Sequence, residues 1–270
     1  FDSMVKPILS YGSDIWGAYL FCDNKKKFDY IIKNQVEKVH QSFLKYTMGL
    51  SRYCPLIGLY GETGRYPLAI TMLKNSMKYL TRVKDMEIDS LLHQCYDNCK
   101  LFKTRYSMWS QISNAVFLHT NVQTPNISFQ GVNATKNNLN LGFRTYWLSA
   151  LHDDGKTVNG NKLRNYRRYK TSFHKEKYLE QNDFERRQSL GRLRLSCHKL
   201  LIETGRHVRL CERLAPEDRL CQYCSAKTCE DELHFIMICP NYSILRKKLL
   251  DNIHSQYQFL SNYSTEECYL

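Results

Sequence analysis

The residues best suited to chemistry in this sequence are cysteines and a histidine near its C-terminal end. Cys221 and Cys224 are separated by two residues, and His234 and Cys239 follow them. Two cysteines at this spacing present both sulfurs from one tight turn, and a structural zinc site is closed by four such ligands in a tetrahedron. The pattern predicts one structural zinc ion (Zn) held by these four side chains. Cys229 leaves the ligand set open, because it can replace His234 or Cys239.

A short helix is expected to position the second pair of ligands. Thr228 and Asp231 fit a helix-capping pattern, and Glu232 adds negative charge to the first turn, where the helix dipole favours it. Pro240 then ends the helix. Isolated buried thiols are the alternative. However, six of the eleven cysteines fall within residues 197–239, and this clustering favours a metal site.

A catalytic zinc site is the enzymatic alternative. A metallo-hydrolase would keep one zinc position open and use Glu232, near His234, as a general base. Ligation rich in cysteine argues against this, because closed structural sites take all four ligands from protein. Glu232 is explained more simply as a charge in the first turn of a helix. We therefore expect a structural ion and no enzymatic activity from this chain.

The sequence carries a concentrated block of positive charge. The formal net charge of the 270 residues is +13, and residues 155–213 hold 16 Lys and Arg against 6 Asp and Glu. Such a block indicates a polyanionic partner. Nucleic acid, either RNA or DNA, is favoured over membrane for two reasons. No amphipathic lipid anchor accompanies the block, and no apolar run approaches the roughly 20 residues of a membrane helix.

Two helices are expected to present these cations. Tyr166, Tyr169 and Phe173 recur at helical spacing, and their rings either stack bases between the basic side chains or form a core stripe. A second apolar stripe runs from Leu190 to Leu201 and leaves cations on the opposite side. An ordinary solvated basic face is the alternative. The candidate nucleic-acid-binding residues are Arg164, Arg167, Arg168, Lys170, Arg192, Arg194, Lys199 and Arg206.

The spacing of apolar residues predicts a mainly α-helical chain. We expect a helical region over residues 1–118. Residues 119–140 lose the helical periodicity and gather Asn, Gln, Thr, Gly and Pro, which indicates a polar linker. A basic helical region is expected over residues 141–210. Residues 211–270 are expected to form a small unit of the zinc-knuckle type, with a C-terminal helix.

Cysteine usage bears on the cellular compartment. Eleven cysteines are an odd number, and a cysteine pair beside a histidine suits a reducing compartment better than a disulfide framework. Four glycosylation-like sequons, at Asn126, Asn133, Asn241 and Asn262, are interpreted as chance matches in an Asn-rich chain. The chain begins at Phe1 rather than Met, so we expect a fragment of a longer intracellular protein.

Several runs of residues point together to one family. They are Ser196–Arg206 (SCHKLLIETGR), Arg219–Cys224 (RLCQYC), Glu230–Phe235 (EDELHF), then Cys239, Pro240, Tyr242 and Arg246. This order resembles the cysteine-rich C-terminal region of LINE-type, non-LTR retrotransposon reverse transcriptases. Lys6–Trp16 (KPILSYGSDIW) is similar to the segment after their polymerase palm, and Gly61–Pro67 (GETGRYP) is similar to another recurrent stretch. Residues 100–160 match only loosely.

The resemblance implies roles for each region. The N-terminal helices would be thumb and connector, while the basic helices and the zinc unit would hold template RNA or target DNA during target-primed reverse transcription in the nucleus. It maps a CCHC ligand set to Cys221, Cys224, His234 and Cys239, which favours His234 over Cys229.

The resemblance also shows what this chain lacks. The parent would be an RNA-directed DNA polymerase, but the family's aromatic-Ala-Asp-Asp hairpin and its endonuclease have no counterpart in this sequence. Without those carboxylates the chain does not hold the two metal ions of phosphoryl transfer. We expect a nucleic-acid-binding tail that works with an upstream polymerase domain. A zinc-stabilised protein-interaction module and a decayed retroelement remnant are the alternatives.

Overall fold

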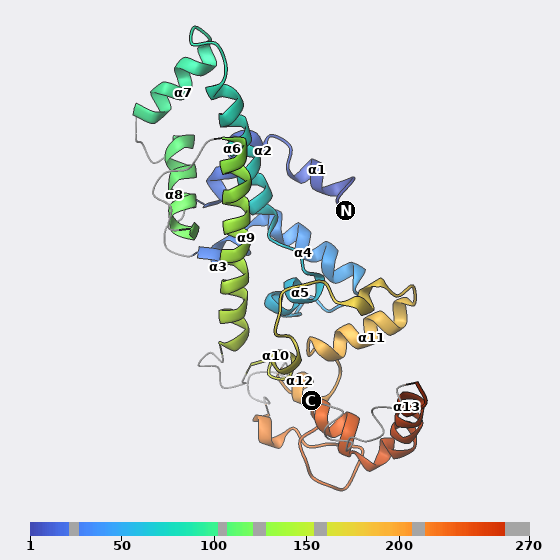
Figure 1. Cartoon of the computed structure of the whole chain (residues 1–270). Coiled ribbons are helices and arrows are strands. Elements are labelled where there is room, and N and C mark those ends of the chain that lie inside the picture. The colour runs from blue at the N-terminus through green and yellow to red at the C-terminus, as the bar shows by residue number, and fades with distance from the viewer. Residues whose placement is uncertain (22–26, 102–106, 121–127, 154–160, 207–213, 257–270) are drawn as a thin grey trace. The chain divides into compact units, whose positions relative to one another are not determined.

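Figure 1 shows the computed structural model, which describes residues 1–21, 27–101, 107–120, 128–153, 161–206 and 214–256. These residues are mainly helical and contain no β-strand. The isolated β-bridges among them join Thr63 to Lys175 and Leu220 to Cys229. The predicted mainly α fold class is confirmed. No helix in this part of the chain combines the length and the apolar composition that crossing a membrane requires.

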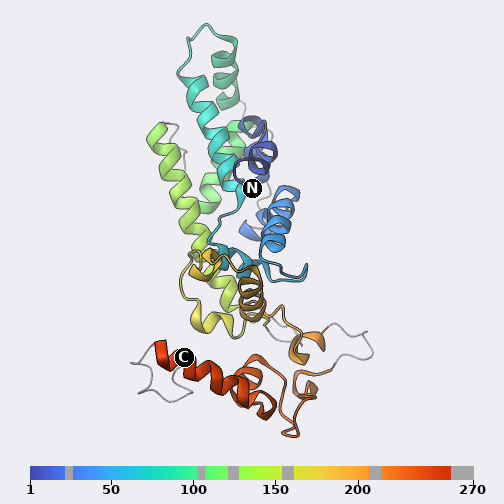
Figure 2. The same cartoon turned by 90° about the vertical axis from the view of Figure 1, so that its right-hand side faces the viewer.

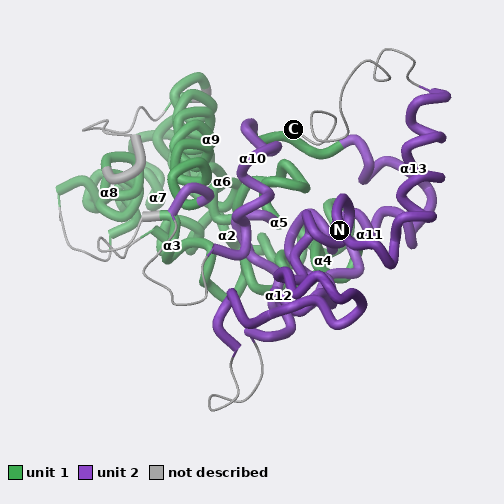
Figure 3. Tube along the Cα trace, turned by 90° about the horizontal axis from the view of Figure 1, so that it is seen from below, with its two compact units in different colours: residues 1–47, 59–150, 173–176 green, residues 48–58, 151–172, 177–270 purple. Residues whose placement is uncertain are grey.

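The chain divides into two compact units, coloured separately in Figure 3. Unit 1 comprises residues 1–47, 59–150 and 173–176, and unit 2 comprises residues 48–58, 151–172 and 177–270. These units do not follow the predicted boundaries. Residues 141–150 belong to unit 1 rather than to a basic region, and residues 48–58 join unit 2. Contacts between residues far apart in the sequence decide which unit a segment joins. Helical periodicity does not reveal these contacts.

Unit 1 is organised around the long helix α6 (Leu68–Lys84), which buries one side. Its buried residues include Ile70, Leu73, Met77 and Leu80, at the predicted helical spacing. Helix α2 (Ser13–Trp16) and the 3-10 turn η1 (Gly17–Phe21) pack against α6, as Figures 1 and 2 show from two sides. The other helices that lie wholly in this unit are α1 (Val5–Leu9), α3 (Lys27–Ile31), α4 (Gln35–Thr47), α7 (Leu91–Leu101) and α8 (Met108–Thr120). Most of α5 (Leu56–Thr63) and of α9 (Phe129–His152) also belongs to unit 1, while residues 56–58 and 151–152 belong to unit 2.

Gly17 marks a close approach between η1 and α6. A Cβ at this position would lie 2.4 Å from Met72 O and 2.9 Å from Ser76 Oγ, the atom that accepts a hydrogen bond from Ala18 N at 3.2 Å. Gly17→Ala forces these backbones apart, so we expect it to lower the free energy of unfolding by about 1–3 kcal/mol in urea denaturation. Gly142→Ala on α9 is the control, since that glycine lies half-exposed in a helix and the change raises stability by about 1 kcal/mol. A neutral Gly17→Ala would contradict this packing.

The predicted linker over residues 119–140 is wrong from residue 129 onward, because α9 occupies that stretch. Residues 121–127 lie outside the described residues. Asn and Thr are weak helix formers, but tertiary packing overrides propensity when a helix buries an apolar stripe. The buried stripe of α9 has spacings of four and seven residues: Val132, Leu139, Phe143 and Trp147.

Unit 2 combines short helical turns with two longer helices. The longer ones are α11 (Phe184–Arg194) and α13 (Ser243–Gln256). The short elements are α10 (Tyr166–Tyr169), η2 (Lys177–Glu180), α12 (Leu201–Thr204), η4 (Pro216–Asp218), η5 (His234–Ile238) and η6 (Pro240–Tyr242).

The helix predicted over Leu190–Leu201 is interrupted. α11 ends at Arg194 and α12 begins at Leu201. Between them Ser196 has a φ of 50°, a left-handed conformation that does not continue an α-helix. The Ser196 hydroxyl donates to Lys162 O at 2.6 Å, which helps to hold this turn. Leu190 is exposed rather than buried, so the predicted apolar stripe does not form one helix face.

Candidate metal centre

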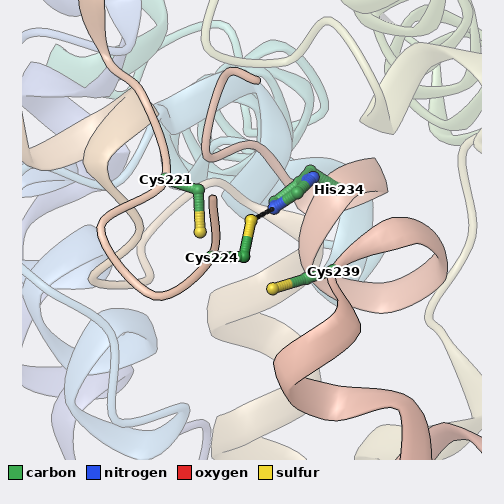
Figure 4. Close-up of side chains that lie close together, drawn as sticks. All are labelled: Cys221, Cys224, His234 and Cys239. Carbon is green, nitrogen blue, oxygen red and sulfur yellow. Dashed lines mark hydrogen bonds between the residues drawn. The ribbon is translucent and has the colours of Figure 1, made fainter. Parts of the chain in front are cut away.

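Four side chains converge in unit 2, and Figure 4 shows them pointing toward one another: Cys221, Cys224, His234 and Cys239. Their ligand atoms all lie within 4.8 Å of one another. Cys224 Sγ is 3.4 Å from His234 Nε2, close to the separation of about 3.6 Å between two ligands bound tetrahedrally at zinc distances. Three of the four are buried, and Cys224 is half-buried. A cluster able to hold a metal ion therefore lies at the predicted residues.

A turn between two paired segments presents the first two cysteines. Leu220 and Cys229 form an antiparallel bridge, and Cys221 N donates to Thr228 O at 2.8 Å. Cys224 lies inside the loop that this pairing closes. The cysteine spacing therefore produces the tight turn that the sequence predicts.

The backbone of this turn acts on the two thiols differently. Tyr223 N donates to Cys221 Sγ at 3.4 Å. Burial nevertheless raises the pKa of Cys221. The backbone N–H of Ala226 lowers the pKa of Cys224. Metal ligation requires thiolates, so amide donors that stabilise sulfur charge suit a metal site.

His234 and Cys239 come from a short helix, as predicted. Asp231 Oδ1 accepts from His234 N at 2.8 Å, so Asp231 rather than Thr228 caps the helix. The turn from His234 to Ile238 is a π-helix, and Cys239 N donates to His234 O at 2.7 Å. Residues five apart are separated by about 140° around an α-helix. A π turn brings them closer to alignment, which places both ligands on one side.

Thr228 and Cys229 take supporting positions. Thr228 Oγ1 lies 2.9 Å from His234 Nδ1, which leaves Nε2 directed at Cys224. Such a partner on the second ring nitrogen fixes the orientation of a metal-binding histidine. Cys229 Sγ instead donates to Pro216 O at 3.5 Å, outside the cluster. The other unassigned cysteine, Cys211, lies outside the described residues.

α13 is joined to the end of the ligand-bearing helix by Arg246. Its guanidinium donates from Nε to Ile236 O at 2.6 Å and from Nη2 to Cys239 O at 2.8 Å. Carbonyls at a helix end lack partners within the helix, and the Cys239 carbonyl also accepts from Tyr242 N at 3.2 Å. The rings of Phe235 and Tyr242 also pack edge to face, with centroids 4.8 Å apart. Arg246 therefore stabilises the turn that carries Cys239.

A buried carboxylate lies close to the ligands in sequence. Glu232 accepts from Arg164 Nη2 at 2.7 Å, Asn165 Nδ2 at 2.9 Å and Ser196 Oγ at 3.1 Å, and His198 Nε2 lies 2.8 Å from it. Burial raises the pKa of Glu232, but the His198 hydrogen bond and the charge of Arg164 outweigh burial and lower the pKa to about 2. A carboxylate with such partners is a poor general base at neutral pH. Glu232 is therefore poorly suited to the role of general base in this site.

Glu203 extends the same network. Arg164 Nη1 lies 2.8 Å from Glu203 Oε1, and Arg206 Nε and Lys162 Nζ lie 2.9 and 3.7 Å from Oε2. Arg164 thus bridges Glu203 and Glu232. The sequence analysis did not identify Glu203 and interpreted Glu232 as a charge in the first turn of a helix. The available signal was the presence of two acidic residues within or beside a strongly basic block.

Arg219 is another buried charge, and it attaches the turn that carries the cysteines to neighbouring segments of unit 2. It is fully buried and donates to Ile202 O at 2.8 Å and to Leu214 O at 2.9 and 3.2 Å. Glu230, on the opposite segment, accepts from Leu201 N at 2.8 Å through its carboxylate and from Ile202 N at 3.2 Å through its carbonyl. These bonds hold α12 against the cysteine turn.

The predicted nucleic-acid-binding residues differ in exposure. Arg164 and Arg206 are held by the buried carboxylates, and Lys170 is only 1% exposed. Contrary to the prediction, Lys170 and Arg206 are buried and Arg164 is only partly exposed, because carboxylates that the sequence pattern did not place draw both arginines inward. Of the remaining five, three are exposed to solvent: Arg168, Arg192 and Lys199. Arg167 and Arg194 are half-buried.

The tyrosines predicted to stack bases have protein partners. Tyr166 is buried. The Arg194 guanidinium carbon lies 4.5 Å from the Tyr169 ring centroid and 5.6 Å from that of Tyr178. Cation–π contacts of this kind hold the arginine against the rings. Of the two alternatives for this stripe, packing in the protein core describes Tyr166 better than stacking on bases does.

A surface pair that the sequence did not predict lies beside Arg192. Arg192 Nε donates to Gly49 O at 2.9 Å, across 143 residues of sequence, and so holds the loop that follows. In that loop the Arg52 guanidinium lies 4.7 Å above the Tyr53 ring, which is 56% exposed. An exposed aromatic ring beside cations is suited to contact bases and phosphates.

Comparisons with protein-family models, with curated proteins and with solved structures found no match to this chain. The resemblance to non-LTR retrotransposon reverse transcriptases therefore rests on the sequence motifs alone. The structure independently provides a Cys3His cluster able to bind a metal ion, set in a mainly helical chain.

Proposed function

We propose that unit 2 is a zinc-stabilised nucleic-acid-binding module, similar to the C-terminal region of non-LTR retrotransposon reverse transcriptases. The observation that carries the proposal is the convergence of three thiols and one imidazole within 4.8 Å. The same unit carries the exposed cations Arg168, Arg192 and Lys199. Together these features support a rigid basic surface on a metal-stabilised scaffold.

Zinc is the ion that this ligand set fits best. Thiolates select soft or borderline ions, and three sulfurs with one imidazole are a common tetrahedral zinc set. Cys221, Cys224, His234 and Cys239 would hold it, and all four ligands come from protein. When bound, the ion cross-links the cysteine turn to the π-helix. It therefore serves the fold rather than a reaction.

The partners follow from the charge and from the family resemblance. Template RNA or target DNA would lie on the exposed cations, with an upstream polymerase domain in the longer protein supplying the chemistry in the nucleus. Contacts to phosphates position a protein without reading base sequence. We therefore expect electrostatic binding with weak sequence preference.

Salt dependence tests this binding mode. If about four phosphates are neutralised, affinity should fall roughly a hundredfold between about 50 and 200 mM salt. Fluorescence anisotropy with labelled single-stranded RNA and duplex DNA measures it. The triple variant Arg168→Glu, Arg192→Glu, Lys199→Glu should bind roughly tenfold or more weakly and show a shallower salt dependence.

A charge-matched variant separates the proposed surface from net charge. Lys33, Lys38 and Lys84 are exposed in unit 1, and changing these three to Glu alters the net charge by the same amount. This control is expected to keep most of the binding. Equal losses in both variants would mean that net charge alone drives association, and binding that ignores salt would contradict the proposal.

Protein docking is the second candidate function, and α13 favours it. Its apolar side chains Ile244, Leu245 and Leu249 are 73%, 63% and 51% exposed, and no residue of α13 is buried. Exposed apolar patches of this kind mark interaction surfaces. Full nucleic-acid binding by the triple variant in unit 2 would favour this candidate over the first.

A further inference from the structure

A groove in unit 1 lies between α6 and α9, two helices that Figure 2 shows side by side, and α2 borders it. Its volume is about 400 Å³, within the range of sites for small ligands. Five residues line it: Lys78, Thr81 and Arg82 from α6, Val132 from α9 and Asp14 from α2. The groove therefore carries positive charge outside the basic block of residues 155–213.

Helical spacing adds two more cations to the same groove. Lys74 precedes Lys78 by one turn of α6, and Lys136 follows Val132 by one turn of α9. Side chains four positions apart share one face of a helix. Burial, and then the like charges of Lys136 and Lys78, lower the pKa of Lys74. Such an effect requires the ammonium groups of the two helices to lie near one another.

Little negative charge offsets these cations. Arg82 Nη2 lies 3.8 Å from Asp14 Oδ2, and both side chains are at least half-exposed, so this pair is weak. The ammonium groups of Lys74, Lys78 and Lys136 make no ion pair or hydrogen bond with any residue that the structure describes. Solvated protein surfaces usually mix both signs, and like charges one turn apart destabilise a helix. Four cations around one carboxylate are therefore suited to an anion.

We propose that this groove binds a ligand with adjacent phosphate groups. Phosphate oxygens accept charge-assisted hydrogen bonds from ammonium and guanidinium groups. Lys78 and Arg82 supply these donors from α6, and Lys136 supplies one from α9. The three cations of α6 span about 12 Å along the helix, which is more than a single phosphate group covers. Val132 lies in the first turn of α9, where the helix dipole also favours an anion.

Two sources carry this phosphate chemistry. A free organic polyphosphate would fill the groove as a small ligand, whereas a nucleic acid would place successive backbone phosphates along it. All of the groove residues belong to unit 1. The site is therefore independent of the function proposed for unit 2.

Lysine acetylation locates the site in the zinc-loaded, 270-residue chain. The probe is inorganic tripolyphosphate, which carries three adjacent phosphates. At about ten times its Kd, it should slow the acetylation of Lys78 and Lys136 roughly tenfold, as quantified peptide by peptide by mass spectrometry. Lys33 and Lys38 are exposed lysines of unit 1 outside the groove and should keep their rates. Equal protection of all four lysines, or protection of none, would overturn the proposal.

A pair of double variants tests the same site by affinity. Lys78→Ala with Lys136→Ala should weaken tripolyphosphate binding roughly tenfold or more in isothermal titration calorimetry, because charge-assisted bonds from both helices are lost. Lys33→Ala with Lys38→Ala removes the same charge and should keep the affinity of the parent. Circular dichroism and zinc content check that both variants are folded. Equal affinities in the two variants would contradict the proposal.

Single-stranded RNA distinguishes the two ligand sources. The acetylation assay is repeated with RNA on the variant Arg168→Glu, Arg192→Glu, Lys199→Glu, which lacks the proposed binding surface of unit 2. Protection of Lys78 and Lys136 by RNA as well as by tripolyphosphate assigns the groove to a nucleic-acid backbone. Protection by tripolyphosphate alone assigns it to a free polyphosphate. Because tripolyphosphate binding reports on unit 1 and RNA affinity in this variant reports on unit 2, the two proposals fail separately.

Discussion

Replacing Cys224 with serine, or His234 with alanine, is expected to remove the metal ion and unfold the C-terminal part of unit 2. A structural zinc ion contributes on the order of 10 kcal/mol to folding, which is comparable to the whole stability of a typical domain. Elemental analysis should find one zinc ion per parent chain and little in either variant. Hydrogen exchange should then show lost protection at Cys221 N and Cys239 N, which donate within the site.

Cys229→Ser is the matched control for this prediction. Cys229 lies in the same turn, but its sulfur donates to Pro216 O and not to the cluster. The variant should keep its zinc ion and its amide protection. The reverse pattern, with zinc lost from Cys229→Ser and kept by His234→Ala, would assign the fourth ligand to Cys229. A reduced, folded parent without zinc would remove the basis for the metal centre.

Glu232→Ala is expected to destabilise unit 2 by about 3–5 kcal/mol, with zinc present throughout. The carboxylate holds Arg164 at 2.7 Å and His198 at 2.8 Å, and both partners are largely removed from solvent. Removing one member of a buried charge network leaves the others unpaired, and that loss costs about this much. Chemical denaturation followed by near-ultraviolet circular dichroism measures it, and zinc content shows that the metal site survives.

An exposed carboxylate provides the comparison for Glu232. Glu217→Ala removes an exposed acidic residue from the same unit and should change stability by no more than about 0.5 kcal/mol. A double-mutant cycle between Glu232→Ala and Arg164→Ala should give a coupling energy of about 0.5–3 kcal/mol, because the two side chains share one network. Additive effects would show that the ion pair at 2.7 Å carries no specific interaction.

Local sequence signals anticipated much of unit 1 and the composition of the metal cluster. Apolar spacing along α6 predicted its buried side, because a helix that buries one face must repeat apolar residues every three or four positions. Gly49 follows α4 by two residues and has a φ of 61°, a left-handed conformation in which glycine commonly ends a helix. The types and spacing of Cys221, Cys224, His234 and Cys239 predicted which side chains meet.

Other features did not follow from local signals. α9 contains many Asn residues, so propensity indicated a linker, and only the packing of Phe143 and Trp147 in unit 1 makes the helix. The basic block was predicted to present all eight candidate cations to nucleic acid, because a sequence shows charge but not pairing. Glu203 and Glu232 draw Arg164 inward, and the exposed cations are fewer than the sequence suggested.

By itself, the sequence determined the helical fold class, the basic character of the chain and the group of cysteines and one histidine from which a metal site is built, since each follows from residue type and short-range spacing. Only the tertiary structure decided that a π turn aligns His234 with Cys239, that Cys229 lies outside the cluster, and that Arg164 bridges Glu203 and Glu232. The physical reason is that short-range spacing of residue types predicts helices and turns. It does not predict which side chains of separate segments will meet. They form because packing and buried charge pairing select them among many alternatives.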